Sequence, residues 1–383
     1  MTGTLDRHDL VHADGRRLYV YGELRGELPS HGHEAGGTTP ALQLRRDVLT
    51  DSWVACSPAR NARPHELGAG SANEPSIASP FAPGGSEVPF AYDAAVFENR
   101  FPSLVEHPPA VPDSDLVAPS LGRCEVVLYT DIEAGSLGSL PPAVVARVVA
   151  IWQDRSRELW SDAAHRHVLV FENRGAEVGA TISHPHGQIY AFDRVPPLVQ
   201  ARVDALAAHR VRRGTCLACE VVADDDRELG RRVSENDSFT IAVPFAARWP
   251  YEVHVRARRH GVRRLTDLAA REALDLARVL REVVQRYDLL YGIELPYLMA
   301  IVEAPLGADD HHLTVEFLPP HRSETKLKVR ASVETVTGLF INDQLPDVCA
   351  AELRAAQPDP VDWSDVVVPA VVRRPAREAI EMR

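Results

Sequence analysis

Two histidines and a glutamine stand at alternate positions within residues 171–192, FENRGAEVGATISHPHGQIYAF. They are His184, His186 and Gln188, and the apolar runs HVLVF and QIYAF around them predict buried strands. Because strand side chains alternate between two faces, both imidazoles and the amide are predicted to share one face. A lone histidine is usually a satisfied core or surface residue. Three aligned polar groups between core strands instead favour a reactive site.

This group of side chains is suited to chemistry on phosphorus. A neutral imidazole is a good nucleophile near pH 7, and the phosphoramidate that it forms remains reactive enough to be displaced. The Gln188 amide can donate a hydrogen bond to a non-bridging phosphoryl oxygen, where negative charge collects.

The elements that position this group occur twice along the chain. The first half has predicted strands at 124–130, 167–171 and 188–192, with a helix from Ser139, as its N-cap, to residue 159. The second half has predicted strands at 239–245, 251–255, 296–305 and 311–320, with a helix from Thr266, as its cap, to residue 290. The matching order indicates an internal repeat, in which Thr314 takes the place of His186.

His-Pro-His-Gly-Gln after an Asn-Arg-Gly loop resembles the active-site signature of the galactose-1-phosphate uridylyltransferase family, in the histidine-triad superfamily. The resemblance implies a ping-pong transferase. His186 attacks the α-phosphorus of UDP-glucose, and galactose 1-phosphate or a related sugar 1-phosphate then accepts UMP from uridylyl-His186. It also implies that the Pro185 carbonyl orients the His186 ring, that His184 and Gln188 belong to the catalytic group, and that no catalytic metal is needed.

Other short stretches resemble family segments that contact the substrate. They imply Arg60 and Arg63 near the nucleotide; Asn99, Arg100 and Phe101 around the uridine; Asn173 and Gly175 beside the phosphates and sugar; Thr181 at a phosphate oxygen; and Lys328 and Glu334 at the sugar phosphate across a dimer interface. The resemblance thus implies a homodimer whose small-molecule partners are a nucleoside diphosphate sugar and a sugar 1-phosphate.

The fold that follows is α+β. Two histidine-triad-like halves, residues 1–200 and 201–350, form a mostly antiparallel sheet with helices packed on one side. Residues 351–383 lie beyond the resemblance and are predicted to be an extended, proline-containing tail that packs on a neighbouring molecule.

A zinc site is predicted in the second half. Cys216, Cys219, His260 and His312 form a Cys₂His₂ set, which suits a closed tetrahedral site, although the spacing is not that of a zinc finger. The repeat supports the assignment, because the first-half counterparts bind zinc in many relatives. We predict one structural zinc per chain, with His311 as an adjacent competitor for the fourth ligand position.

The first half departs from the family at its own metal positions. Ser79 and Ala82 replace a cysteine pair, and Ile132 or Glu133 replaces a histidine, so that only His184 remains. No metal is predicted there. The positions that bind iron in some relatives hold Val302, Thr314 and Glu316, and no iron is predicted either.

Composition limits the remaining possibilities. The 383 residues are 45% hydrophobic and carry a formal charge of −12, which argues against non-specific binding to nucleic acid or a membrane surface. No apolar run of about eighteen residues occurs and the first residues lack an apolar signal core, so a cytoplasmic enzyme is predicted.

Two alternatives remain open. Val302, Arg330 and Val333 differ from what relatives commonly carry, which leaves open a related nucleotidyltransferase or phosphorylase that uses another nucleotide or sugar phosphate. The other alternative is a nucleotide-sugar-binding protein without turnover, against which the intact His184, His186 and Gln188 argue.

Overall fold

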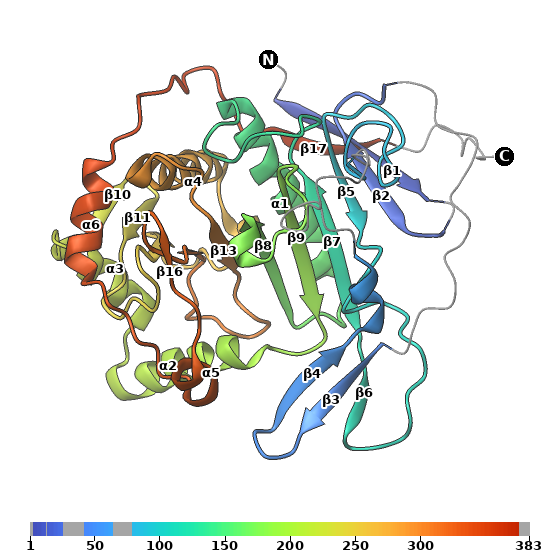
Figure 1. Ribbon diagram of the computed structural model, residues 1–383, viewed down its shortest axis with the longest axis horizontal. Helices are drawn as coiled ribbons and strands as arrows, with labels where there is room; N and C mark the ends of the chain where they lie inside the picture. The colour runs from blue at the N-terminus through green and yellow to red at the C-terminus, as the bar shows by residue number, and fades with distance from the viewer. Residues whose placement is uncertain (1–2, 13, 26–41, 64–78, 375–383) are drawn as a thin grey trace.

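The computed structural model describes residues 3–12, 14–25, 42–63 and 79–374 (Figure 1). A twelve-stranded sheet runs through this part of the chain, antiparallel at every pairing except that of β1 with β17. In spatial order its strands are β10 (Arg232–Glu235), β11 (Phe239–Ala242), β12 (Val253–Ala257), β14 (Thr314–Leu318), β13 (Tyr297–Val302), β8 (His167–Arg174), β9 (His186–Phe192), β7 (Gly122–Leu128), β5 (Ala94–Glu98), β2 (Arg17–Tyr21), β1 (Thr4–Val11) and β17 (Ala370–Arg374). The predicted α+β class and mostly antiparallel sheet are confirmed.

The two halves of the sheet meet at the antiparallel pair β8 and β13. Outward from this junction the order is β9, β7, β5 on one side and β14, β12, β11 on the other. The strand order therefore repeats as the sequence predicts. His186 begins β9 and Thr314 begins β14, so these two residues occupy corresponding positions.

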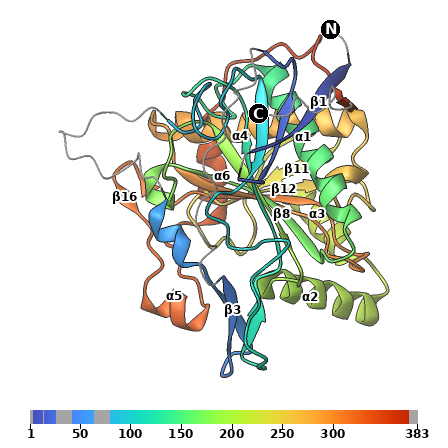
Figure 2. The same ribbon diagram turned by 90° about the vertical axis from the view of Figure 1, so that its right-hand side faces the viewer.

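The long helices α1 (Pro142–Ser161) and α4 (Ala270–Tyr291) pack against each other on one face of the sheet (Figures 1 and 2). They bury the main apolar core, to which β9 contributes Ile189 and Ala191. The predicted caps are wrong in detail. Pro141 precedes α1, and a fixed proline φ suits this turn. Ala269 precedes α4, where the Glu272 carboxylate accepts the Ala269 N–H at 2.8 Å.

The opposite face of the first half carries a second apolar cluster. It joins residues of the sheet to the segment that follows Ser79, and its members include Phe81, Tyr92, Phe97 and Val126. Since β9 side chains alternate, His186 and Gln188 face this side, away from α1 and α4.

The remaining elements lie around the sheet. They are β3 (Gln43–Asp47), β4 (Ser52–Cys56) and β6 (Val117–Pro119), which form a small separate sheet; the 3₁₀ turns η1 (Pro58–Ala62), η2 (Ala176–Val178) and η3 (Leu265–Asp267); the hairpin β15 (His321–Ser323) and β16 (Lys326–Leu327); and the helices α2 (Pro197–Arg213), α3 (Leu217–Arg227), α5 (Ser332–Thr337) and α6 (Pro346–Ala355). Among the described residues, none of the helices combines the length and apolarity needed to cross a membrane.

The C-terminal segment packs on its own chain, and its residues 351–355 belong to α6, which corrects the extended tail predicted from residue 351. After α6 the chain passes along the edge of the helical layer to β17, which pairs with β1 (Figure 1). Trp363, Val366, Val368 and Val371 pack against the main core. These apolar side chains explain why the segment binds the sheet of its own molecule.

Ending the chain at Gln357 tests this packing. We expect the free energy of unfolding to fall by about 2–4 kcal/mol, because apolar contacts and the β1–β17 ladder are lost. Urea denaturation followed by circular dichroism measures the change. An unchanged midpoint would show that the segment adds no stability.

Candidate active site

The strand that carries the candidate nucleophile is held on both sides. Residues of β9 pair with β7 and β8, which place Gln188 opposite Val126 and Phe171. Between His186 and Gln188, Gly187 faces the other way, where a Cβ would collide with the Tyr129 hydroxyl. That hydroxyl donates to the buried Glu172 carboxylate at 2.8 Å. Glycine therefore allows β9 to lie close to a buried polar pair.

One ring nitrogen of His186 is fixed by the backbone. Its Nδ1 lies 2.7 Å from the His184 carbonyl oxygen, and since a carbonyl can only accept, Nδ1 carries the proton. This corrects the expectation for Pro185, whose carbonyl instead accepts the Tyr129 N–H at 3.2 Å. The Nε2 lone pair is left available at the half-buried ring.

The surroundings of His186 keep the ring neutral. Burial lowers its pKa to about 4; the hydrogen bond to the His184 carbonyl opposes this shift, while the charges of the His184 ring and of Arg63 add to it. Burial also lowers the pKa of His184. A neutral His186 at pH 7 has the nucleophilic form that attack on phosphorus requires.

His186 opens into a pocket with about 580 Å³ of empty space, part of it continuous with solvent. The walls are formed by Arg63, Pro80, Phe81, Ser86, Glu87, Phe97, Asn99, Arg100, Phe101, Val126, Thr181, Ile182, His186 and Gln188. The structure thus brings together seven predicted site residues, from Arg63 to Gln188. Asn99 accepts the Phe101 N–H at 2.8 Å through Oδ1, so its amide NH₂ remains free to donate to a ligand.

Other predicted residues lie outside these walls. Arg60 does not line the pocket but stabilises the segment of the wall at Phe101. It forms hydrogen bonds of 3.3 Å to the Phe101 carbonyl and 3.2 Å to the Tyr190 hydroxyl. Asn173 lies in β8, near its end, and Gly175 follows that strand with a φ of 96°. His184 lies beneath the pocket, with 1% of its surface exposed.

Lys328 and Glu334 bind each other. Lys328 Nζ lies 2.6 Å from Glu334 Oε1 and also donates to the Ile341 carbonyl. Hydrogen bonding to Lys328 and to the Ile341 N–H lowers the pKa of Glu334 to about 2. The pair holds the segment around α5 in shape and does not line the pocket of its own chain.

Several wall residues were missed in the sequence. Phe97 and Val126 were missed; they stand in one row with the predicted Gln188 across β5, β7 and β9, because Phe97 pairs with Val126 and Val126 with Gln188. The alternation of side chains limits each residue to one of two sheet faces. Only the register between the strands shows that the three side chains are neighbours on the same face. Glu87 is held in the wall by an ion pair of 2.7 Å with Arg16, a contact across 71 positions that no local pattern signals.

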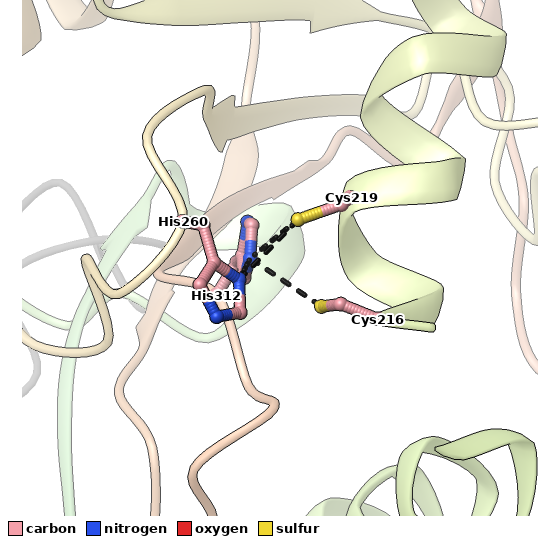
Figure 3. A group of neighbouring side chains, drawn as sticks. All are labelled: Cys216, Cys219, His260 and His312. Atoms are coloured by element: carbon pink, nitrogen blue, oxygen red, sulfur yellow. Dashed lines mark hydrogen bonds between the residues drawn. The ribbon is translucent and has the colours of Figure 1, made fainter. Parts of the chain in front are cut away.

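Four possible metal ligands converge in the second half. Cys216, Cys219, His260 and His312 bring one ligand atom each within 4.8 Å of one another, and Figure 3 shows the cysteines at the start of α3 facing both imidazoles. His312 Nδ1 donates to the Ala257 carbonyl at 3.3 Å, which directs its Nε2 into the cluster. His312, and not His311, therefore completes the set.

The separations of the other three ligand atoms from His312 Nε2 suit a tetrahedral ion. His312 Nε2 lies 3.2 Å from His260 Nδ1, 3.4 Å from Cys219 Sγ and 3.6 Å from Cys216 Sγ. Zinc with nitrogen at about 2.1 Å and sulfur at about 2.3 Å gives tetrahedral edges of roughly 3.4–3.8 Å. The donor set and its geometry fit a structural zinc.

The positions at which no iron is predicted form other contacts. The Glu316 carboxylate pairs with Arg248 at 3.0 Å and with Arg202. The Thr314 hydroxyl donates to the His312 carbonyl at 3.2 Å. Glu316 is thus engaged by two guanidinium groups.

Two family models match the chain. Residues 38–196 match the galactose-1-phosphate uridyl transferase N-terminal domain, and residues 202–357 match the C-terminal domain of the same family. Among curated proteins, galactose-1-phosphate uridylyltransferase of Thermotoga maritima is 39% identical over 82% of this chain and 99% of its own length. The Streptomyces lividans protein of that name is 33% identical over 81% of this chain and 86% of its own length.

Solved structures agree. A uridylyltransferase structure superimposes with a TM-score of 0.74 at 32% identity, over 82% of this chain and 98% of the other. An ADP-glucose phosphorylase of Arabidopsis thaliana superimposes with a TM-score of 0.62 at 24% identity, over 81% of this chain and 97% of the other, which shows the shared fold.

Proposed function

This chain belongs to the galactose-1-phosphate uridylyltransferase family, and we propose that His186 is the residue that carries the nucleotide between its two substrates. It is an enzyme of the hexose-1-phosphate uridylyltransferase type. The donor that we propose is UDP-glucose and the acceptor galactose 1-phosphate. The observation that carries the proposal is the His186 ring, with Nδ1 bound to the His184 carbonyl and Nε2 left for the pocket.

The reaction follows from this orientation. His186 Nε2 attacks the α-phosphorus, so an N–P bond forms while the P–O bond to glucose 1-phosphate breaks. Nδ1 keeps its proton, and the positive charge that develops on the ring lies against the His184 carbonyl oxygen. A phosphate oxygen of galactose 1-phosphate then attacks the same phosphorus, and the N–P bond breaks. No proton transfer at Nε2 is needed in either step.

The pocket walls supply charge and shape complementarity. Gln188 and Arg63 lie beside His186 and donate to the non-bridging phosphoryl oxygens. The rings of Phe97 and Phe101 and the Asn99 amide receive the nucleoside, with Arg100 at the rim and Thr181 at a phosphate oxygen. We assign Asn173 and Gly175 to the sugar end, and Arg60 to support of the Phe101 segment.

We also propose a homodimer. The segment from β16 to α6 exposes a run of apolar side chains, namely Leu327, Val329, Val333, Val336, Leu339, Ile341 and Leu345. Such a surface suits a second copy of the chain. The segment that carries Lys328 and Glu334 then reaches the sugar-phosphate end of the partner's pocket. Size measurement by light scattering, with Val336→Glu as the disrupting variant, tests the dimer.

Zinc is the metal that we propose for the second-half cluster, at one per chain. Cys216, Cys219, His260 and His312 would hold it, and its chemistry there would be structural, since four protein ligands close the coordination sphere. The thiols of this set would remain available as metal ligands in a reducing compartment. All five cysteines are free, which supports a cytoplasmic location.

The donor is identified by measuring intact mass after brief exposure to a panel of nucleoside diphosphate sugars. A uridylyl increment with UDP-glucose is expected. An adenylyl or guanylyl increment would keep the mechanism and replace the base, as in the alternative of a related nucleotidyltransferase or phosphorylase. Absence of any adduct or turnover, with binding retained, would favour a nucleotide-sugar-binding protein.

The pH dependence of the first step follows from the state of His186. Its pKa is lowered to about 4, so the neutral nucleophile is retained as pH falls and is lost only near that value. We expect the rate of adduct formation to be constant from about pH 8 to about pH 5, and to fall about tenfold per unit below the pKa. Rapid-quench mass measurement after a pH jump gives the profile. A midpoint near the ordinary histidine value would contradict the neutral-ring account.

A further inference from the structure

The His184 imidazole has a hydrogen-bonding arrangement that the reaction above does not explain. The ring is buried, and its Nε2 lies 2.7 Å from the Thr130 carbonyl oxygen and 3.2 Å from the Tyr92 hydroxyl oxygen. Because the carbonyl can only accept, Nε2 carries the hydrogen. The Tyr92 oxygen can therefore only accept from this ring.

The proton of the Tyr92 hydroxyl goes elsewhere. Tyr92 is fully buried, and its hydroxyl donates to the Phe81 carbonyl at 2.6 Å. The hydroxyl thus accepts from His184 and donates to Phe81, so it connects two segments that are far apart in sequence. The hydroxyl group is therefore satisfied both as a hydrogen-bond donor and as an acceptor, as a buried polar group should be.

The two residues that Tyr92 connects are the ones that contact the nucleophile. The His184 carbonyl accepts the His186 Nδ1 proton at 2.7 Å. The Phe81 ring meets the His186 ring edge to face, with centroids 5.2 Å apart and planes at 69°. Phe81 also packs edge to face on the His184 ring, at 6.2 Å. His186 is held between a hydrogen bond and an aromatic contact.

The repeat gives these contacts a counterpart in the second half. Ser79 to Ala82 corresponds to Cys216 to Cys219, and His184 corresponds to His312. In the second half, Sγ atoms of both cysteines lie within 3.6 Å of His312 Nε2, where a metal would tie the two segments together. Among the described residues, that cluster alone offers three or more grouped ligands. In the first half, the Tyr92 hydroxyl joins the same two segments.

We propose that Tyr92 is a positioning residue for the nucleophile: its hydroxyl locks the Phe81 segment to His184, so that the two contacts of the His186 ring are held as one unit. The proposal rests on the proposed function of His186. Its consequence concerns the chemical step, because a ring that swings away from the in-line direction reacts more slowly while donor binding at the pocket walls is retained.

The test compares Tyr92→Phe with Tyr287→Phe. Tyr287 is a matched control, since it is fully buried in α4 and its hydroxyl also donates to a backbone carbonyl, that of Tyr251, at 2.8 Å. Single-turnover formation of uridylyl-His186 from UDP-glucose is followed by rapid quench and intact mass. We expect the rate constant at saturating donor to fall about 10- to 100-fold in Tyr92→Phe, with the donor dissociation constant changed less than about twofold. Tyr287→Phe should keep the wild-type rate constant.

The amplitude of adduct formation in the single-turnover experiment distinguishes a loss of nucleophile positioning from a loss of folded protein. Partial unfolding lowers the fraction of chains that react and leaves the rate constant of the remainder unchanged, a result that would overturn the proposal. An unchanged rate constant and amplitude in Tyr92→Phe, with a normal wild-type adduct, would overturn it as well. Absence of an adduct in the wild type with every donor of the nucleoside diphosphate sugar panel would instead reject the function assigned to His186.

A second variant covers the case in which Tyr92→Phe does not fold. Phe81→Leu keeps the backbone carbonyl and the Tyr92 hydroxyl but removes the ring edge beside His186. We expect its rate constant at saturating donor to fall about three- to tenfold; since Phe81 also lines the pocket, the donor concentration that saturates this variant is determined separately. A wild-type rate constant in this variant would show that the aromatic contact does not hold the nucleophile.

Discussion

His186→Ala is expected to lower turnover by about 10⁴-fold or more and to abolish the covalent adduct, because loss of a nucleophile removes both steps of a ping-pong reaction. Among the described residues that line the pocket, His186 is the only histidine. His184 is buried beneath the pocket with Nε2 committed to Thr130, and the wall residues Gln188 and Arg63 are not nucleophiles. Steady-state assays and intact mass with UDP-glucose measure the two effects.

His165→Ala is the matched control for this variant. His165 is also buried in the first half, and its Nδ1 lies 2.7 Å from the Leu159 carbonyl at the end of α1, outside the pocket. We expect it to retain the adduct and most of the turnover. A modest rate loss in His186→Ala, or an adduct that persists there, would remove His186 as the nucleophile.

Loss of the second-half metal is expected to have the largest effect on stability. Binding of a structural zinc contributes about 10–16 kcal/mol in small domains, and part of this energy would tie α3 to the segments that carry His260 and His312. We expect Cys216→Ala to reduce zinc from about one per chain to none, and to lower the midpoint of thermal unfolding by about 10 °C or more. Elemental analysis and calorimetry provide the measurements.

Two control variants test whether the loss of zinc is specific to the four proposed ligands. Cys56→Ser removes a free cysteine from β4, outside the cluster, and should keep both zinc and the unfolding midpoint. His312→Ala should lose zinc while His311→Ala keeps it, because only His312 faces the cluster. Turnover well below the unfolding midpoint should change little in the zinc-free protein. Two zinc ions per chain, or none in the wild type, would contradict the assignment.

The sequence was sufficient where local periodicity decides the outcome. His186 and Gln188 share a face because β9 alternates, and Cys216 and Cys219 lie at the start of α3, from which both thiols reach one point. The strand order repeats as predicted because each half must bury the same apolar face against a helix. These features depend on neighbours in the chain or on repetition of a pattern.

The sequence was insufficient where distant segments meet. Tyr92, Phe81 and His184 come from three stretches whose contact depends on how the segment after Ser79 folds over the sheet. Arg60 is one turn away from Arg63, yet only Arg63 lines the pocket. The His184 carbonyl binds the His186 ring while the Pro185 carbonyl binds the Tyr129 N–H, and no residue pattern specifies which of the two carbonyls takes which partner.

The pairing of β1 with β17 has a consequence for the order in which the molecule is assembled. During synthesis β1 leaves the ribosome early and pairs with β2, but its outer edge has no partner until β17 emerges. An open edge with Leu5 beneath it can recruit strands of other nascent chains. Pairing of the late strand β17 therefore closes the open edge of β1. Slow translation of the final stretch would lengthen the time in which that edge is exposed and would raise the demand for chaperones.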